Sequence, residues 1–342
     1  MSTKRYQIEE FLLKTENIPI LDVRSPGEYT QGHIPGAISF PLFDNEERAI
    51  IGTLYKQKGR REAIKKGLEI IGPKMLLFTE NAEKLNASTL GIYCWRGGMR
   101  SESMAWLLSL LGLNLMVLDK GYKAYRNHMI AFFEKKLPLR VITGYTGSKK
   151  THLLNILKEK GEQVVDIEGF ARHQGSSFGN MKSVSQPTTE EFQNSLFYEF
   201  SKMDINKPIW IEDESMNIGR VNMPEGLFKR KTESPHFLIR VEKKQRVQFL
   251  IDDYKELSKE QLIKATWAIS KKLGKENTED AINYINDGNL AKAAEIILTY
   301  YDERYKKSLS KKIHLVRDTY HIDLSTLENF AIELIHKTKN DL

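Results

Sequence analysis

Short apolar runs alternate with segments of helical periodicity along the first part of the chain. The runs that we expect to form strands lie at residues 19–23, 38–40, 90–93 and 114–119. Residues 48–70 are rich in charge and predict a helix, as do residues 103–108. Strands that alternate with helices are typical of a mostly parallel sheet. The pattern therefore predicts one α/β unit over residues 1–128.

A second series of apolar runs begins near residue 138 and ends near residue 242. Its expected strands lie at residues 139–143, 163–167, 208–212 and 236–241, with an amphipathic helix at residues 189–203. From residue 243 the pattern changes to helical spacing alone, as in Val247, Leu250, Ile251 and Tyr254. We therefore expect a second α/β unit over residues 138–242 and an all-helical region over residues 243–342.

Length and composition fit this division into parts. A chain of 342 residues exceeds one ordinary core, and 40% hydrophobic with 28% charged residues is typical of a folded protein. No apolar run is long enough to cross a bilayer, and the first residues lack an apolar secretory core. These features predict a cytoplasmic protein. A single cysteine excludes an internal disulfide and a multi-cysteine metal site.

The net charge of +7 permits a polyanionic partner such as RNA but does not require one. A lysine-rich solvated surface explains the same excess. The run from Lys306 to Lys312 leaves the same two interpretations open: contact with nucleic-acid phosphates, or an exposed basic face.

The one cysteine, Cys94, lies on a tight loop between an expected strand and an expected helix. The loop reads Cys94-Trp95-Arg96-Gly97-Gly98-Met99-Arg100-Ser101. Backbone N–H groups and a helix N-terminus favour an anion there, and Arg96 and Arg100 add positive charge. Such surroundings favour the nucleophilic thiolate. The alternative, a small buried apolar residue, fits this loop less well.

A second loop, between the strand at 139–143 and the following helix, resembles a P-loop. The P-loop pattern is a glycine, four residues, then glycine, lysine and serine or threonine. Gly144, Lys150 and Thr151 match this pattern, but Lys149 replaces the second glycine. That glycine lets the backbone approach phosphates without a Cβ, so Lys149 either strains or widens the loop. We expect the loop to bind a phosphate or diphosphate. The expected binding residues are Gly144, Thr146, Gly147, Ser148, Lys149, Lys150 and Thr151.

Three acidic residues, Glu212, Asp213 and Glu214, end the expected strand at 208–212. They occupy the place where a P-loop protein holds Mg²⁺, so Thr151 and Asp213 are candidate magnesium ligands, with Glu212 as the alternative to Asp213. The alternative is a solvated acidic turn.

Residues 1–128 resemble a rhodanese domain, which carries sulfur as a persulfide on a loop cysteine. The matching segments are Asp22 to Tyr29, Gly32 to Ala37 and the Cys94 loop. A persulfide anion could be held by the N–H groups and arginines of that loop. We interpret Asp22 and Arg24 as a structural ion pair and His33 as a turn residue, in preference to catalytic roles.

The two units in this order resemble the bacterial tRNA 2-selenouridine synthases over nearly the whole chain. The further matching segments are His173 to Gly179, Gln186 to Thr188, Ile211 to Ser215 with Ile218 to Arg220, and Tyr300 to Asp302 with Tyr305. The chain departs from the family pattern at Lys149 and at Gln174, where arginine is expected. Both departures concern the affinity of the second unit for its phosphate ligand.

The resemblance implies an enzyme that modifies the wobble uridine of tRNA. The family converts 5-substituted 2-thiouridine at position 34 to 2-selenouridine through an S-geranyl intermediate. Its co-substrates are selenophosphate and geranyl diphosphate; Mg²⁺ is a further candidate, and no tightly bound organic cofactor is expected. Cys94, Arg96 and Arg100 are the expected catalytic residues. The candidate contacts to tRNA or ligand are Trp95, Arg172, Ser176, Ser177, Asp213 and Arg220, with Trp95 also suited to core packing.

The implied partners are the tRNA anticodon loop and, as a further candidate, an enzyme that supplies selenophosphate. No membrane partner is expected, and the oligomeric state stays open. Two other functions also remain open. One is a rhodanese-type sulfurtransferase that moves persulfide sulfur to a small acceptor. The other is a non-enzymatic phosphate-ligand sensor or tRNA-binding scaffold with an altered P-loop, for which Lys149 is the main argument.

Overall fold

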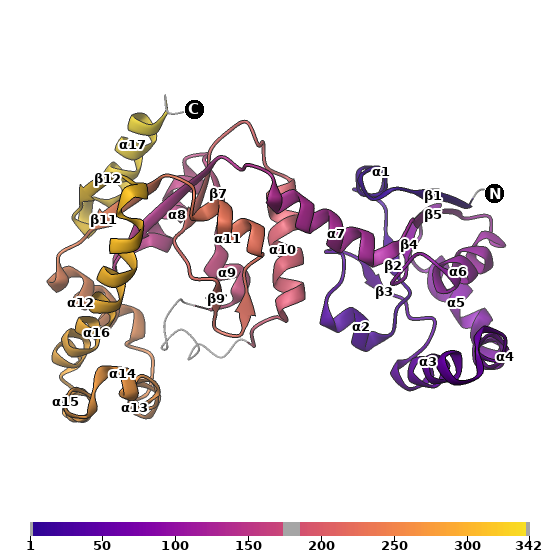
Figure 1. Ribbon diagram of the computed structural model, residues 1–342, viewed down its shortest axis with the longest axis horizontal. Helices are drawn as coiled ribbons and strands as arrows, with labels where there is room; N and C mark the ends of the chain where they lie inside the picture. The colour runs from indigo at the N-terminus through magenta and orange to yellow at the C-terminus, as the bar shows by residue number, and fades with distance from the viewer. Residues whose placement is uncertain (1–2, 174–184, 340–342) are drawn as a thin grey trace. The chain divides into compact units, whose positions relative to one another are not determined.

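The computed structural model describes residues 3–173 and 185–339. The chain divides into two compact units, residues 1–132 and residues 133–342. Each unit contains its own five-stranded parallel sheet (Figure 1). The expected α/β class, with two parallel sheets and a mainly helical C-terminal portion, is confirmed.

The first sheet has the strand order β1-β5-β4-β2-β3, and every pair in it is parallel. Its strands are β1 (Thr3–Tyr6), β2 (Ile20–Asp22), β3 (Ile38–Ser39), β4 (Thr89–Tyr93) and β5 (Asn114–Leu118). Four of these strands match expected runs. The edge strand β1 was not expected, because its residues are polar and largely exposed.

Helices connect the strands of the first unit. They are α1 (Ile8–Lys14), α2 (Pro26–Gln31), α3 (Asn45–Lys58), α4 (Arg60–Ile71), α5 (Met75–Glu83), α6 (Met99–Ser109) and α7 (Gly121–Glu134). The single helix expected at residues 48–70 is in fact α3 followed by α4. Gly59 separates them because its φ of +85° cannot continue a right-handed helix.

The second sheet has the order β12-β11-β6-β8-β7, again with parallel pairs. Its strands are β6 (Leu139–Gly144), β7 (Gln163–Val165), β8 (Ile209–Glu212), β11 (His236–Arg240) and β12 (Val316–His321). The short strands β9 (Asn217–Ile218) and β10 (Val221–Asn222) form a separate antiparallel pair. In the central strand β6 every residue is buried, which fits a sheet covered on both faces.

Helices of the second unit are α8 (Lys150–Glu159), α9 (Ile167–Ala171), α10 (Thr189–Ser201), α11 (Glu225–Lys231), α12 (Lys243–Tyr254), α13 (Lys259–Ala268), α14 (Ser270–Leu273), α15 (Lys275–Asn286), α16 (Leu290–Lys312) and α17 (Leu327–Thr338). Leucines of α8 and apolar residues of α17 pack with Trp210 and Phe237 of the sheet in one core. Helices α13, α15 and α16 enclose a second, separate apolar core.

The region after residue 243 is helical as expected, except that it contributes the edge strand β12 to the second sheet. Strand β12 has the sequence Val-Arg-Asp-Thr-Tyr-His, and most of its residues are exposed. We expected strands only where a continuous apolar run occurs. A polar edge strand has no such run, so the sequence pattern did not reveal β12. Among the described residues, no helix is long and apolar enough to cross a membrane.

Candidate functional sites

Cys94 follows strand β4 and precedes helix α6, as the sequence indicates. Its side chain is only 3% exposed and belongs to the apolar core of the first unit. The Ser101 hydroxyl lies 3.2 Å from Cys94 Sγ and 3.0 Å from the Gly98 carbonyl oxygen. Ser101 can therefore donate a hydrogen bond to the sulfur when the sulfur is anionic. This contact was missed, because Ser101 could be read simply as a helical residue.

Backbone N–H groups surround the start of helix α6. None of the backbone hydrogen bonds among the described residues uses an N–H of residues 95–101 as its donor. These groups include the first N–H groups of the helix, which carry the positive end of its dipole. The loop therefore offers donors to an anionic atom or group bound at the mouth of the site.

The turn before helix α7 fixes the shape of the Cys94 loop. The N–H of Tyr122 donates to the Cys94 carbonyl at 2.8 Å, and that of Lys123 donates to the Trp95 carbonyl at 3.1 Å. Gly121 has a φ of +56°, and a Cβ there would lie 2.2 Å from the Cys94 carbonyl oxygen. A Cβ on Gly97 would lie 2.7 Å from the Leu118 carbonyl oxygen. Only glycines allow the two backbones to approach this closely.

The two arginines of the loop differ in their partners. Arg100 forms a two-point ion pair with Glu28, with N–O distances of 2.7 and 3.3 Å. Burial alone would raise the pKa of Glu28, but the hydrogen bonds and charge of Arg100 hold that pKa below its usual value. Arg96 is exposed and lines an open pocket with Lys120, Lys123 and Asn127. Arg96 is therefore the arginine that faces solvent beside the loop.

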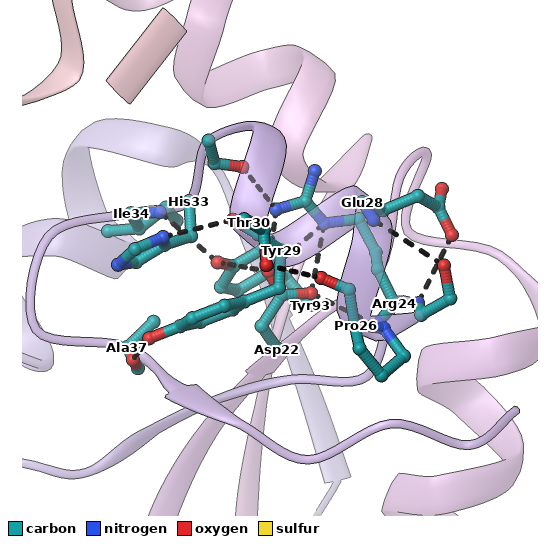
Figure 2. Close-up of polar contacts among 12 residues, drawn as sticks. Asp22, Arg24, Pro26, Glu28, Tyr29, Thr30, His33, Ile34, Ala37 and Tyr93 are labelled. Atoms are coloured by element: carbon teal, nitrogen blue, oxygen red, sulfur yellow. Dashed lines mark hydrogen bonds and ion pairs between the residues drawn. The ribbon is translucent and has the colours of Figure 1, made fainter. Parts of the chain in front are cut away.

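A buried ion pair joins Asp22 and Arg24, next to Tyr93 (Figure 2). Arg24 and Asp22 are fully buried, and Arg24 Nη2 lies 2.6 Å from Asp22 Oδ2. Tyr93 donates its hydroxyl to the same carboxylate at 2.8 Å. The guanidinium carbon of Arg24 lies 3.9 Å from the centroid of the Tyr122 ring, and the Tyr122 backbone holds the Cys94 carbonyl. These contacts give the pair a structural role, as we interpreted it.

Trp95 and His33 lie at the edge of this buried group. Trp95 is 37% exposed and tilted against the Tyr122 ring at 5.7 Å, so it does not fill the core. His33 stacks on Tyr29 at 3.9 Å, and its Nδ1 lies 3.1 Å from the Tyr29 carbonyl oxygen (Figure 2). The stacking and the contact with the Tyr29 carbonyl lie within helix α2 and the turn after it.

The phosphate loop connects strand β6 to helix α8, which is the P-loop arrangement. Lys149 adopts the left-handed conformation, with φ 54° and ψ 35°. The lysine thus strains the loop instead of widening it. Gly147 has a φ of +80°, and a Cβ on Gly144 would lie 2.8 Å from Ser148 Oγ. The loop therefore keeps a tight turn.

Lys150 and Thr151 begin helix α8, beside the buried carboxyl group of Glu212 and the half-buried ones of Glu168 and Glu214. Lys150 Nζ donates to the Gly144 carbonyl at 3.2 Å. Thr151 Oγ1 lies 3.5 Å from both Glu168 Oε2 and Glu212 Oε2. Burial raises the pKa of Glu168, Glu212 and Glu214, and repulsion between neighbouring carboxyl groups adds to this for Glu168 and Glu212. The sequence did not point to Glu168, because it lies outside the P-loop pattern.

Asp213 has other partners than those expected of a magnesium ligand. Its carboxylate contacts Lys231 Nζ at 2.7 Å, Lys312 Nζ at 2.9 Å and the Thr143 hydroxyl at 2.8 Å. Burial alone would raise the pKa of Asp213, but the nearby His236 imidazole and the two ammonium groups hold it well below its usual value. The carboxylate beside Thr151 is that of Glu212, not Asp213. Among the described residues, no group of three or more His, Cys, Asp or Glu is arranged to hold a metal ion.

Two helices of the C-terminal portion hold the phosphate loop. Arg246 of α12 donates to the Thr146 carbonyl at 3.1 Å and pairs with Asp302 of α16 at 2.8 Å. Tyr305 bonds to the Thr143 hydroxyl at 2.6 Å and packs against Tyr145 at 4.6 Å. The Tyr300 to Tyr305 segment therefore stabilises the strand and loop that carry the phosphate site, a role that the sequence did not reveal.

The remaining expected contacts lie around Gln186. Its side chain bridges the Ala171 and Ile218 carbonyls and accepts a hydrogen bond from the backbone N–H of Arg220 at 2.8 Å. Arg172 ends helix α9 and lies 3.4 Å from the Ser185 carbonyl. The Gln186 side chain thus joins the backbone segments that carry Arg172 and Arg220. Gln174, Ser176 and Ser177 lie outside the described residues.

Comparisons with known proteins match family models to the parts of the chain that contain the Cys94 loop and the phosphate loop. Residues 8–128 match the model of the rhodanese-like domain, and residues 137–323 match that of the tRNA 2-selenouridine synthase AAA domain. The tRNA 2-selenouridine synthase of Bdellovibrio bacteriovorus is 40% identical over 251 residues. That alignment covers 70% of this chain and 65% of the Bdellovibrio protein, slightly less than two thirds of its length.

Other relatives align over more of their length. The tRNA 2-selenouridine synthase of a Sulfurovum species is 31% identical over 302 residues, covering 85% of this chain and 81% of its own. That of Shewanella denitrificans is 30% identical over 332 residues, which covers 86% of this chain and 89% of the Shewanella protein. The matches extend across both units and both loops, so this chain belongs to the tRNA 2-selenouridine synthase family.

Proposed function

We propose that this chain replaces the sulfur of a 5-substituted 2-thiouridine at position 34 of tRNA with selenium, through an S-geranyl intermediate. The observation that carries the proposal is the presence of two different anion-binding loops in one chain. The Cys94 loop is suited to a sulfur or selenium anion, and the loop before α8 is suited to a diphosphate. The proposed chemistry requires both.

In the first stage, the phosphate loop binds geranyl diphosphate. The thiocarbonyl sulfur of the base attacks the first carbon of the geranyl group, so that a C–S bond forms and the C–O bond to diphosphate breaks. Diphosphate leaves with the electron pair of that bond. Lys150 and the N–H groups at the start of α8 stabilise the charge of the leaving group. Any Mg²⁺ would enter as its complex with diphosphate, beside the Thr151 hydroxyl.

In the second stage, selenophosphate supplies the selenium. Water cleaves its P–Se bond, and phosphate leaves. The selenium anion attacks the ring carbon that carries the S-geranyl group, the C–S bond breaks, and geranylthiol leaves after taking up a proton. We assign the holding of the selenium species to Cys94, the Ser101 hydroxyl and the free N–H groups of the loop. Arg96 and the nearby Lys120 and Lys123 provide positive charge for the anionic substrates.

The test uses the purified full chain with tRNA that contains 2-thiouridine, followed by mass spectrometry of the nucleosides. Geranyl diphosphate alone should produce the S-geranyl nucleoside, and later addition of selenophosphate should produce 2-selenouridine. Cys94→Ala should keep the first product and lose the second. Normal selenation by Cys94→Ala would disprove the role of the thiol.

A matched control separates the two loops. Lys150→Ala should lose geranylation, yet it should still convert tRNA that is already S-geranylated when selenophosphate is supplied. The rhodanese-type alternative predicts that neither tRNA product forms. In that case the chain would pass persulfide sulfur from Cys94 to a small thiol acceptor and would leave the tRNA unchanged.

A further inference from the structure

An apolar pocket lies beside the phosphate loop, inside the second unit. Helices α12, α13, α15 and α16 form its walls, and Thr146 of the loop forms one edge. The pocket contains about 600 Å³, counted to its open mouth.

The pocket borders the phosphate loop. Leu250 lines the pocket, and its Cγ would lie 3.3 Å from a Cβ placed on Gly147, so α12 is in contact with the loop at this point. Thr146 belongs to both, because its carbonyl is held by Arg246 while the residue also lines the pocket. A ligand whose anionic end binds the loop can therefore extend its other end into the pocket.

The lining has the chemistry of a hydrocarbon site. Besides Thr146 and Leu250, the walls consist of Ile251, Tyr254, Leu262, Ile285, Leu290, Ala293, Ala294, Ile297, Leu298 and Tyr301. No charged side chain of the described residues lines it. A nucleotide base needs hydrogen-bond partners along its edges, and this surface is almost entirely aliphatic or aromatic. An apolar chain buried here leaves no polar group without a hydrogen-bond partner.

We propose that this pocket binds the isoprenoid chain of the diphosphate substrate, with the diphosphate on the loop from Gly144 to Thr151. The assignment rests on the proposed function, because it takes an allylic diphosphate as the ligand of that loop. It adds the location of the ten-carbon chain and the residues that select it. The apolar chain is the source of affinity, and the loop places the reacting carbon at its own edge of the pocket.

Binding to the full chain tests this directly, without tRNA. Calorimetry should be carried out with inorganic diphosphate, dimethylallyl diphosphate and geranyl diphosphate. Affinity should increase along this series, with geranyl diphosphate ~10- to 100-fold tighter than inorganic diphosphate, because each buried methylene adds to apolar burial. Equal affinities for the three ligands would overturn the proposal.

A variant whose side chain fills the pocket provides a second test of the assignment. Ala294→Phe places a ring in the pocket, and it should weaken geranyl diphosphate ~10-fold or more while inorganic diphosphate binds as before. Ala291→Phe is the matched control, since residue 291 is exposed on the same helix. Ile251→Thr, on the half-buried wall, should give a smaller loss of about fivefold and serves if Ala294→Phe does not fold.

The two proposals fail in different ways. If chain-length dependence is found and is lost in Ala294→Phe, but tRNA is never geranylated, the pocket assignment stands and the proposed function fails. If tRNA is geranylated and Ala294→Phe has the same KM for geranyl diphosphate as the unaltered chain, the pocket assignment fails and the function stands. Unchanged binding of geranyl diphosphate by both pocket variants likewise overturns the assignment.

Discussion

The ammonium group of Lys149 lies 5.0 Å from the centroid of the Phe249 ring, and His152 meets the same ring edge-on at 5.4 Å. Lys149 stands where the P-loop pattern has glycine, and its φ of +54° is the conformation that glycine adopts there. The chain thus keeps the backbone shape of a P-loop with a side chain in a strained conformation. The cation–π contact with α12 offsets part of that strain.

Replacement of Lys149 should separate backbone strain from charge. Lys149→Gly removes the left-handed strain, whereas Lys149→Ala keeps it and loses the contact with Phe249. We expect Lys149→Gly to have a free energy of unfolding ~1 kcal/mol higher than Lys149→Ala, measured by urea denaturation. Both should bind diphosphate more weakly than the unaltered chain. Equal stability of the two variants would show that the left-handed conformation is not maintained in solution.

The close approach of Gly121 to the Cys94 carbonyl gives a second prediction. Gly121→Ala places a methyl group 2.2 Å from that oxygen, at a φ of +56°, so the turn and the Cys94 loop must separate. We expect a loss of ~2–4 kcal/mol in the free energy of unfolding and an altered rate of Cys94 alkylation.

Gly112→Ala is the matched control for Gly121→Ala. Gly112 also has a positive φ, of +82°, but a Cβ there meets no atom within 4 Å. Its cost should be limited to the backbone effect of ~1 kcal/mol, with unchanged alkylation of Cys94. A similar cost for both variants would show that the contact with the Cys94 carbonyl contributes little.

The central strands could be predicted from the sequence because they are short, continuous apolar runs. Strands β4 and β6 were expected within one residue of their observed ends. The edge strands β1 and β12 could not be found this way, because their residues are mostly exposed and polar. A strand whose side chains are buried on both faces of the sheet appears in the sequence as an apolar run. An edge strand that is paired only through its backbone leaves no such run.

The loops of both sites could also be located from local motifs, since α6 begins at Met99, shortly after Cys94, and α8 begins at Lys150. The residues that support these loops could not be located from local motifs. Arg246 and Asp302 stabilise the phosphate loop from helices far along the chain, and the Lys312–Asp213 pair depends on the fold of α16. Contacts of this kind depend on tertiary packing that a motif does not contain.

Glu168 should make stability depend on pH in the direction opposite to an ordinary ion pair. Its pKa is raised in the folded state by burial and by Glu212, so the folded protein keeps a proton that the unfolded chain loses above its pKa of ~4.3. Stability should therefore fall as pH rises from that value towards the raised pKa.

The neutral variant Glu168→Gln tests this sign. It should be more stable than the unaltered chain by ~1–3 kcal/mol at pH 7.5, and the difference should disappear near pH 4. The measurement is urea denaturation over this pH range. Glu159→Gln, at an exposed position of α8, should show no such gain. A gain that is independent of pH would rule out the charge of Glu168 as its cause.

Asp213 should contribute strongly to stability through charges that it neutralises inside the second unit. Lys231 is fully buried, and its ammonium group lies 2.7 Å from Asp213 Oδ1. Asp213→Asn leaves that charge buried without its partner, so we expect a loss of ~3–5 kcal/mol by urea denaturation. Lys312 is 23% exposed and can turn towards solvent, so it should contribute less to this loss.

The double variant Asp213→Asn with Lys231→Met identifies the cause of that loss. Methionine fills a similar length without a charge, so removal of the buried ammonium group should recover part of the stability. If the double variant is as unstable as Asp213→Asn alone, the loss comes from the other contacts of the carboxylate, with Lys312, His236 and the Thr143 hydroxyl, instead of the unpaired Lys231. Because Thr143 also bonds to Tyr305, that result would assign the carboxylate to holding α16 against the end of β6.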